Sequence, residues 1–307
     1  MRTHLGLAVC TAWAALAVWA GPAAATDEPK KVRVILIDGQ NNHDWPTTTP
    51  FLKKALEDSG RFTVDVSTSP PKVNDKRVPK IKATAPFPPD LSKYDVLVSN
   101  YNGDPWPAEL QKDLEKRLKE GQIALAIVHA ANNSFQGWGE YNLMIGMGWR
   151  NNKFGDRLTL DGEGKERRVP KGEGPGAGHG PRHPFKIVVR DREHPITKGM
   201  PAEWLHAKDE LYQGMRGPIA NVHLLATAYS DKKFSGTGEH EPMIWTVRYG
   251  KGRVFHTPMG HDLTALRCVG LTTTLLRGTE WAATGKVTLS VPDNFPTAKD
   301  TSTVPGK

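Results

Sequence analysis

Runs of apolar residues separated by polar turns predict strands that alternate with helices along this chain. Residues 32–37 and 94–99 are mostly apolar, which is typical of parallel strands buried on both faces. Between them, an amphipathic helix begins at Pro46 and ends at Gly60, and a short strand follows at residues 62–66. A strand, a helix and a second strand in this order form a right-handed unit with parallel strands. We therefore expect a parallel sheet.

The same alternation continues through the rest of the chain. A helix at residues 108–120 ends at Gly121, the next strand follows at residues 122–128, and a last helix is expected at about residues 263–283. Tyr249-Gly250-Lys251-Gly252 forms a tight hairpin turn. Further strands are expected at residues 185–190, 222–227, 243–248 and 253–256. This pattern predicts one α/β domain over residues 26–298, with a doubly wound, mostly parallel sheet and an added antiparallel hairpin.

Three segments depart from the pattern. Residues 70–89 are rich in proline and lysine and predict a long surface loop. Residues 137–182 are charged and glycine-rich, as expected of a long insertion that is either flexible or a lid over a site. Residues 299–307 are expected to form a disordered tail.

The first 25 residues have the features of a secretory signal peptide. An apolar stretch follows Met1-Arg2-Thr3-His4 and ends before Ala23-Ala24-Ala25, an A-x-A site at which cleavage after Ala25 is expected. The apolar stretch is short for a membrane span, so we expect a secreted or periplasmic protein without stable membrane insertion. Of the two cysteines only Cys268 would remain, so the mature protein has no internal disulfide.

The net charge does not indicate a nucleic-acid partner. The formal charge is +8, and loss of Arg2 with the signal peptide lowers it to +7. The basic residues are scattered, and their densest group lies in the proline-rich segment 72–82. No basic helix, zinc finger or aromatic RNA-binding surface is evident, which argues against nucleic-acid binding.

Three histidines each follow a predicted strand. His43 comes after residues 32–37, His129 after residues 122–128, and His261 after residues 253–256. If the strands are parallel, the three imidazoles meet at the carboxyl edge of one sheet, where α/β sheets bind ligands. A single histidine in such a place is more often structural, but three together indicate a site.

Two chemistries are compatible with these histidines. In one, His43, His129 and His261 bind a divalent metal, most naturally zinc, with Glu210 or Asp262 as a carboxylate ligand. In the other, the imidazoles transfer protons without a metal, because a histidine with a pKa of about 6.5 titrates near neutral pH. A purely structural role is the third possibility.

Other residues are candidates for binding a substrate. Asp209 and Glu210 are adjacent carboxylates near Tyr212 that could accept a proton or hold sugar hydroxyls, or could lie in a solvated loop. Aromatic rings bind the apolar faces of sugars, and the tryptophans near strand ends are Trp45, Trp106, Trp138 and Trp149. His179 and His183 have a spacing found in helical metal sites, but glycines and prolines surround them.

A covalent nucleophile is not evident. Many α/β enzymes place a nucleophile at the turn after a central strand, but here the turn reads His129-Ala130-Ala131. Ser134 lies further on without a neighbouring base, and Cys268 falls within a helical pattern. Acyl transfer through serine or cysteine is therefore disfavoured.

Several motifs, in order, resemble the ThuA-like proteins, named for trehalose utilisation. The resemblance covers roughly residues 32–283. It depends on Asn42-His43-Asp44-Trp45, Val128-His129-Ala130-Ala131, His183-Pro184-Phe185, His194-Pro195-Ile196-Thr197-Lys198-Gly199, Asp209-Glu210-Leu211-Tyr212, Glu241-Pro242-Met243-Ile244-Trp245, Tyr249-Gly250-Lys251-Gly252-Arg253-Val254 and Gly260-His261-Asp262.

The resemblance implies a flavodoxin-like three-layer α/β/α sandwich related to class I glutamine amidotransferases. Glutaminase activity is not carried over, because the cysteine of those relatives is missing from the turn at Ala130. The expected function is an exported carbohydrate-active enzyme that hydrolyses, cleaves or isomerises a glycoside or keto-sugar derivative. His129, His261, Glu210 and Asp262 would be catalytic, and Trp45, Asp209, Tyr212 and His183 would bind substrate. The alternative is a non-catalytic sugar-binding or scaffold protein.

Overall fold

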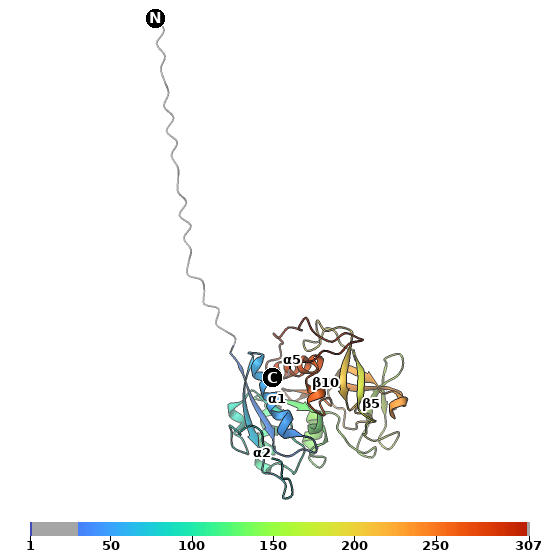
Figure 1. Cartoon of the computed structure of the whole chain (residues 1–307). Helices are drawn as coiled ribbons and strands as arrows, with labels where there is room; N and C mark the ends of the chain where they lie inside the picture. The colour runs from blue at the N-terminus through green and yellow to red at the C-terminus, as the bar shows by residue number, and fades with distance from the viewer. Residues whose placement is uncertain (2–29, 306–307) are drawn as a thin grey trace. The chain divides into compact units, whose positions relative to one another are not determined.

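The computed structural model describes Met1 and residues 30–305 of the chain (Figure 1). Residues 31–307 form one compact unit. The predicted signal peptide lies outside the described residues. None of the described helices has the length and apolar character needed to cross a bilayer.

One mixed sheet of 11 strands forms the centre of this unit. Its first five strands in spatial order, β2-β1-β3-β4-β11, are parallel, and β10-β9-β7-β8 continue it in antiparallel fashion. The strands are β1 (Val32–Asp38), β2 (Phe62–Thr68), β3 (Val96–Ser99), β4 (Ala124–Val128), β5 (Arg157–Leu160), β6 (Glu166–Val169), β7 (His183–Val189), β8 (Glu203–Asp209), β9 (Val222–Tyr229), β10 (His240–Tyr249) and β11 (Gly252–Thr257). In Figure 1 the blue strands from the first part of the chain lie on the left, and β5 lies on the right.

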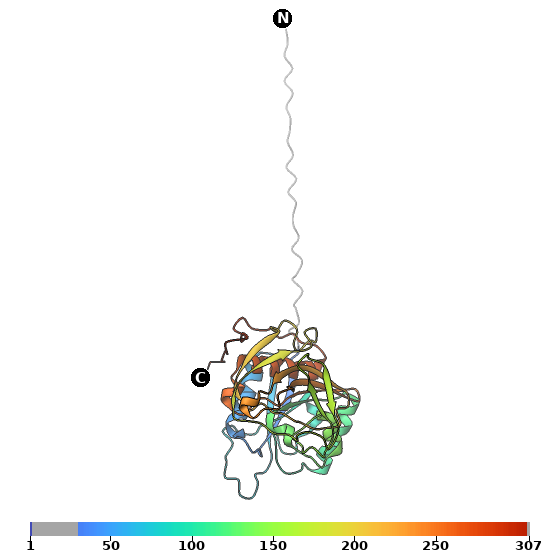
Figure 2. The same ribbon diagram turned by 90° about the vertical axis from the view of Figure 1, so that its right-hand side faces the viewer.

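Helices cover both faces of the parallel part. Helices α1 and α5 pack on one face and α2 and α3 on the other, as Figure 2 shows for α1 against α2 and α3. The helices are α1 (Trp45–Asp58), α2 (Ala108–Glu120), α3 (Gly139–Ile145), α4 (Leu263–Leu266) and α5 (Val269–Thr284), with 3-10 turns at Leu91–Lys93, His129–Asn133 and Lys232–Phe234.

The alternation of side chains along each strand divides the core into two layers. In β1, Val34 and Leu36 pack with Leu52 of α1, whereas Ile35 and Ile37 face the layer that contains the leucines of α2. Both sets are buried, which is why the strand is apolar at nearly every position. The predicted α/β/α sandwich is confirmed, with a mostly parallel core, and its antiparallel part extends beyond the predicted hairpin to β9, β7 and β8.

The expected final helix is interrupted. Asp262 caps α4, and a new helix, α5, begins after Cys268. The break leaves backbone groups that the end of the chain satisfies, because Val269 donates to Ser302 and Val304 donates to Arg267 at 2.9 and 2.8 Å. Ser302 and Val304 belong to the tail that the sequence predicts to be disordered, and their backbone groups make these hydrogen bonds to the break between α4 and α5.

The glycine-rich insertion also contains regular structure. Helix α3 and strands β5 and β6 occupy its first part, and β5 joins β10 at the sheet. Its second part is held by Arg216, whose guanidinium donates to the carbonyls of Gly155, Pro170 and Pro175. A fully buried cation with this many acceptors organises the segment around it. Strand β8 was not predicted, because charged residues alternate with its buried positions.

Helix α5 approaches β11 so closely that it needs a glycine. A Cβ atom at Gly278 would lie 2.4 Å from the buried Phe255 ring. We expect Gly278→Ala to lower the free energy of unfolding by about 1–3 kcal/mol, because overpacking outweighs the roughly 1 kcal/mol gain in helix propensity. Urea unfolding measures this. Gly137→Ala is the control, since its Cβ would meet nothing within 4 Å; equal stability of the two variants would contradict the close packing.

Candidate functional site

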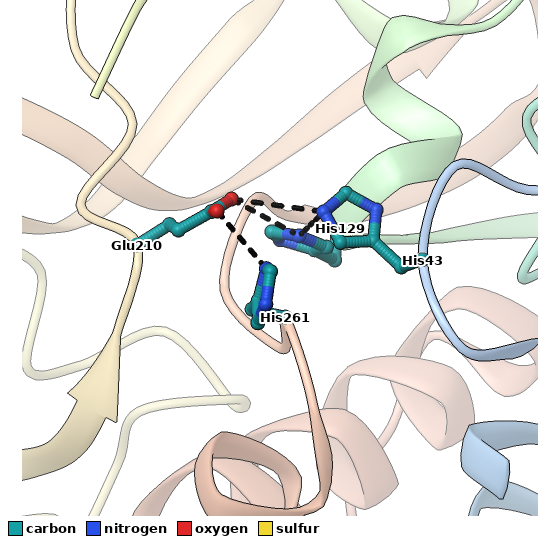
Figure 3. Close-up of side chains that lie close together, drawn as sticks. All are labelled: His43, His129, Glu210 and His261. Carbon is teal, nitrogen blue, oxygen red and sulfur yellow. Dashed lines mark hydrogen bonds and ion pairs between the residues drawn. The ribbon is translucent and has the colours of Figure 1, made fainter. Parts of the chain in front are cut away.

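The three histidines that follow parallel strands meet at one edge of the sheet (Figure 3). His43 follows β1, His129 follows β4, and His261 follows β11, which pairs with β4 in parallel. Glu210, directly after β8, joins them from the antiparallel part of the sheet. One ligand atom from each of the four residues lies within 4.8 Å of the other three.

His129 is held in an unusual backbone conformation at the end of β4. Its φ of 44° lies in the left-handed region, which a non-glycine residue adopts only when its surroundings enforce it. Its Nδ1 donates to the carbonyl of Pro258 at 2.7 Å, so Nε2 is left as the acceptor that faces the cluster. Burial and the nearby His43 lower the pKa of His129 to about 4, so the ring is neutral at physiological pH.

His43 is oriented by Asn41. The Asn41 Oδ1 accepts from the backbone N–H of His43 at 3.0 Å and lies 3.3 Å from its Nδ1. Asn41 is itself anchored, since its Nδ2 donates to the carbonyl of Asn100 at 3.2 Å. The turn after β1 therefore directs Nε2 of His43 towards Nε2 of His129, 3.3 Å away.

Glu210 is the acidic centre of the cluster. Its carboxylate oxygens lie 3.0 Å from Nδ1 of His261, 3.6 Å from Nε2 of His129 and 3.8 Å from Nε2 of His43. Burial would raise the pKa of Glu210, but His261 and His43 hold it well below its usual range. The Glu210 carboxylate in turn raises the pKa of His261. Glu210 is therefore ionised whenever the protein is folded near neutral pH.

Asp209 aligns the two halves of the site. Its carboxylate accepts from the backbone N–H groups of Glu210 at 2.8 Å, Gly260 at 2.8 Å and His261 at 3.1 Å, and from Nε2 of His206 at 2.8 Å. Both Asp209 and His206 are completely buried. Burial would lower the pKa of His206, but Asp209 raises it to about 9, so the two form a buried ion pair.

The geometry fits a divalent metal. Tetrahedral ligands about 2.1 Å from zinc lie about 3.4 Å from one another. The separations of 3.0, 3.3, 3.6 and 3.8 Å in the cluster lie around this value, and all four ligand atoms lie within 4.8 Å of one another. The Pro258 carbonyl and Asn41 supply the second hydrogen bonds that orient metal-binding histidines. Among the described residues, buried Nδ1 of His261 has no partner with hydrogen-bond geometry, although Glu210 is 3.0 Å away. A cation between the two would satisfy both.

The remaining predicted site residues have other surroundings. Asp262 caps α4 and pairs with Arg182, so its carboxylate is committed outside the cluster. The ring of His183 stacks on Phe234, with centroids 3.8 Å apart. Trp45 is 2% exposed and offers no ring face to a sugar.

Buried contacts also explain Asp209 and Tyr212. The hydrogen bonds of Asp209 make it a positioning group and leave no exposed oxygen for a substrate. Tyr212 is 1% exposed, and its hydroxyl lies 3.4 Å from Nε2 of His129. Tyr212 therefore supports the cluster from within the protein.

Sequence reasoning missed two features of the site. His206 lies in β8, whose mixed polar pattern hid the strand and gave no signal for a buried histidine. His179 was considered only with His183, but its Nε2 lies 3.3 Å from Glu210, and its ring is 5.7 Å from that of Trp149. The spacing of His179 and His183 indicated a candidate segment, but it did not indicate that only His179 contacts Glu210.

Removing the charge of Asp209 tests its role in alignment. We expect Asp209→Asn to lower the free energy of unfolding by about 3–5 kcal/mol, because His206 loses the partner that keeps it charged in the core and three backbone N–H groups lose a charged acceptor. Urea unfolding at pH 7 measures this. The exposed Asp58→Asn, which removes only an ion pair with Lys54, should change stability by less than about 1 kcal/mol.

The same ion pair predicts a pH dependence. The pKa of His206 is raised in the folded state, so its stabilisation is complete below pH 6.5 and is lost as the pH rises through about 9. Urea unfolding of the wild type and of Asp209→Asn across this pH range measures the effect. The same pH dependence of the free energy of unfolding in both proteins would contradict the buried ion pair.

Comparison with known proteins places the chain in a family. A family model named ThuA, with the description trehalose utilisation, matches residues 33–282. A ThuA-like protein from Parabacteroides merdae is 41% identical, with a TM-score of 0.81 over 90% of this chain and 98% of that chain. Another from Bacteroides uniformis, 17% identical with a TM-score of 0.53 over 87% and 97%, shares the fold. No curated protein sequence matches. The family match over most of its length shows that the chain belongs to the ThuA family.

Proposed function

We propose that this chain is a carbohydrate-active enzyme with a metal-assisted mechanism. The observation that carries the proposal is the set of four ligand atoms from His43, His129, Glu210 and His261, all within 4.8 Å of one another. The family's link to trehalose utilisation supports a sugar derivative as substrate. A glycoside or keto-sugar that is hydrolysed, cleaved or isomerised fits this site best.

Zinc is the metal that these ligands favour. Three imidazole nitrogens and one carboxylate oxygen form a nitrogen-rich set, whereas magnesium and calcium prefer oxygen ligands. The low pKa values of His129 and Glu210 keep both groups deprotonated, as ligands must be. A bound zinc ion would polarise a sugar oxygen or lower the pKa of a water molecule.

The chain's own residues would orient the ligands and exclude water. Pro258 and Asn41 keep Nε2 of His129 and His43 directed at the centre of the cluster. The Asp209 carboxylate accepts from the backbone N–H groups of both Glu210 and His261, which keeps these two residues close although they come from different parts of the sheet. The burial of Tyr212 beside His129 closes the inner side of the site.

We also propose that the protein is exported. The apolar stretch before Ala23-Ala24-Ala25 supports a signal peptide that is removed after Ala25. Cys268 is buried, so export to an oxidising compartment leaves no exposed thiol on the described residues of the mature protein.

Metal analysis separates the proposed mechanism from its alternatives. We expect about one equivalent of zinc in the purified mature protein and in His223→Ala, which removes an exposed histidine that pairs with Asp191. Glu210→Gln and the double variant His129→Ala/His261→Ala should lose the metal, because each removes ligands. Elemental analysis of all four, with thermal unfolding to show that they fold, measures this. Full metal content in the double variant would rule out this site.

A substrate screen tests the enzyme itself. The zinc-loaded wild type should convert a member of a panel of disaccharides, simple glycosides and their oxidised keto derivatives, observed by NMR. Glu210→Gln should lower that rate at least 100-fold, since both the metal and a carboxylate are affected. A metal-free wild type that still converts sugar would favour acid–base catalysis by the histidines. A protein that binds sugars without converting any would favour a binding or scaffold role.

A further inference from the structure

A fourth histidine stands at the outer side of the cluster. Nε2 of His179 lies 3.3 Å from Oε1 of Glu210, and its side chain is 34% exposed, compared with 12% for His43 and 4% for His129. The set of mutually close ligand atoms found among the described residues does not include it. His179 therefore lies between the proposed metal ligands and solvent, where a substrate would enter.

The backbone holds one nitrogen of His179 and leaves the other directed at the site. Its Nδ1 lies 2.7 Å from the carbonyl of Gly180, which can only accept, so Nδ1 carries the hydrogen. Nε2 therefore faces the Glu210 carboxylate, 3.3 Å away. A hydroxyl group of a ligand near this position could hydrogen-bond both Nε2 and the carboxylate.

The segment that carries His179 is fixed by close backbone contacts. Gly178 and Gln213 exchange backbone hydrogen bonds of 3.0 and 2.9 Å. A Cβ atom at Gly180 would lie 1.7 Å from the carbonyl oxygen of Phe234, so glycine is required there. Arg182, three residues after His179, pairs with Asp262 at the start of α4. The glycines thus permit close packing, and His179 has a defined position over the site.

An aromatic ring completes this outer side. Trp149 is partly exposed, and its ring centroid lies 5.7 Å from that of His179 and 4.6 Å from that of Tyr212. A sugar presents hydroxyl groups at its edge and C–H groups on its face, and aromatic rings bury the latter. His179 and Trp149 together match both parts of such a ligand.

We propose that His179 is a substrate-binding residue that hydrogen-bonds a sugar hydroxyl through Nε2, while Trp149 covers an apolar face of the ring. This inference depends on the proposed metal-assisted sugar chemistry and adds to it the residues that orient the substrate. His179 is not a metal ligand in this arrangement.

Cobalt and acetohydroxamate test the inference without a known substrate. Co²⁺ takes the place of zinc and reports binding through its visible spectrum. Acetohydroxamate binds a metal through two neighbouring oxygens, as a sugar could, and its N–H and oxygen atoms can hydrogen-bond to Nε2 of His179. We expect His179→Ala to weaken acetohydroxamate binding to the Co²⁺ protein about tenfold, the loss of one hydrogen bond of roughly 1.4 kcal/mol. Its affinity for Co²⁺ should stay within about twofold of wild type.

Two further variants separate a binding role from a structural one. His179→Gln should recover part of the acetohydroxamate affinity, because its amide group can donate or accept a hydrogen bond near the position of Nε2. His223→Ala, an exposed histidine paired with Asp191, should leave both affinities unchanged. Thermal unfolding of each variant shows whether it folds.

The outcomes distinguish this inference from the proposed function. Unchanged acetohydroxamate affinity in His179→Ala would overturn the role of His179 and leave the metal site intact. Loss of Co²⁺ from His179→Ala would show that His179 is a metal ligand, which contradicts the inference that it binds only the substrate. A wild type that binds Co²⁺ without acetohydroxamate would have no open position for a substrate, which also contradicts it. A wild type that binds no Co²⁺ would contradict the metal site itself.

Discussion

The buried ion pair between Asp209 and His206 is the interaction on which the site depends. One carboxylate holds the backbone N–H groups of Glu210, Gly260 and His261, which belong to two segments about 50 residues apart in sequence. The charge of Asp209 is tolerated in the core because His206 and these N–H groups surround it. Without these hydrogen bonds, no shared side chain would fix the backbone of Glu210 relative to that of His261.

Parallel strands do the rest of the positioning. β1, β4 and β11 run in the same direction, so the turns after them open on the same edge, and a histidine in each turn reaches the same place. The positive φ of His129 shows that the turn after β4 is strained to present its ring.

The glycines of the insertion permit close backbone packing rather than flexibility. A segment with glycine at alternate positions suggests flexibility, yet here Gly178 pairs with Gln213 and Gly180 lies against the carbonyl of Phe234. The buried Arg216 fixes several of the surrounding carbonyls. Close backbone contact, which only glycine permits, holds His179 beside Glu210.

The sequence by itself determined the sandwich, its parallel strands and the meeting of His43, His129 and His261, because strand periodicity and the position after each strand are local properties. Only the tertiary structure decided that Glu210 and not Asp262 faces these histidines, that His179 and not His183 reaches the site, and that Trp45 is buried. Those choices depend on antiparallel register, on the path of an insertion and on helix capping. Each is set by contacts between residues far apart in sequence, which no local pattern encodes.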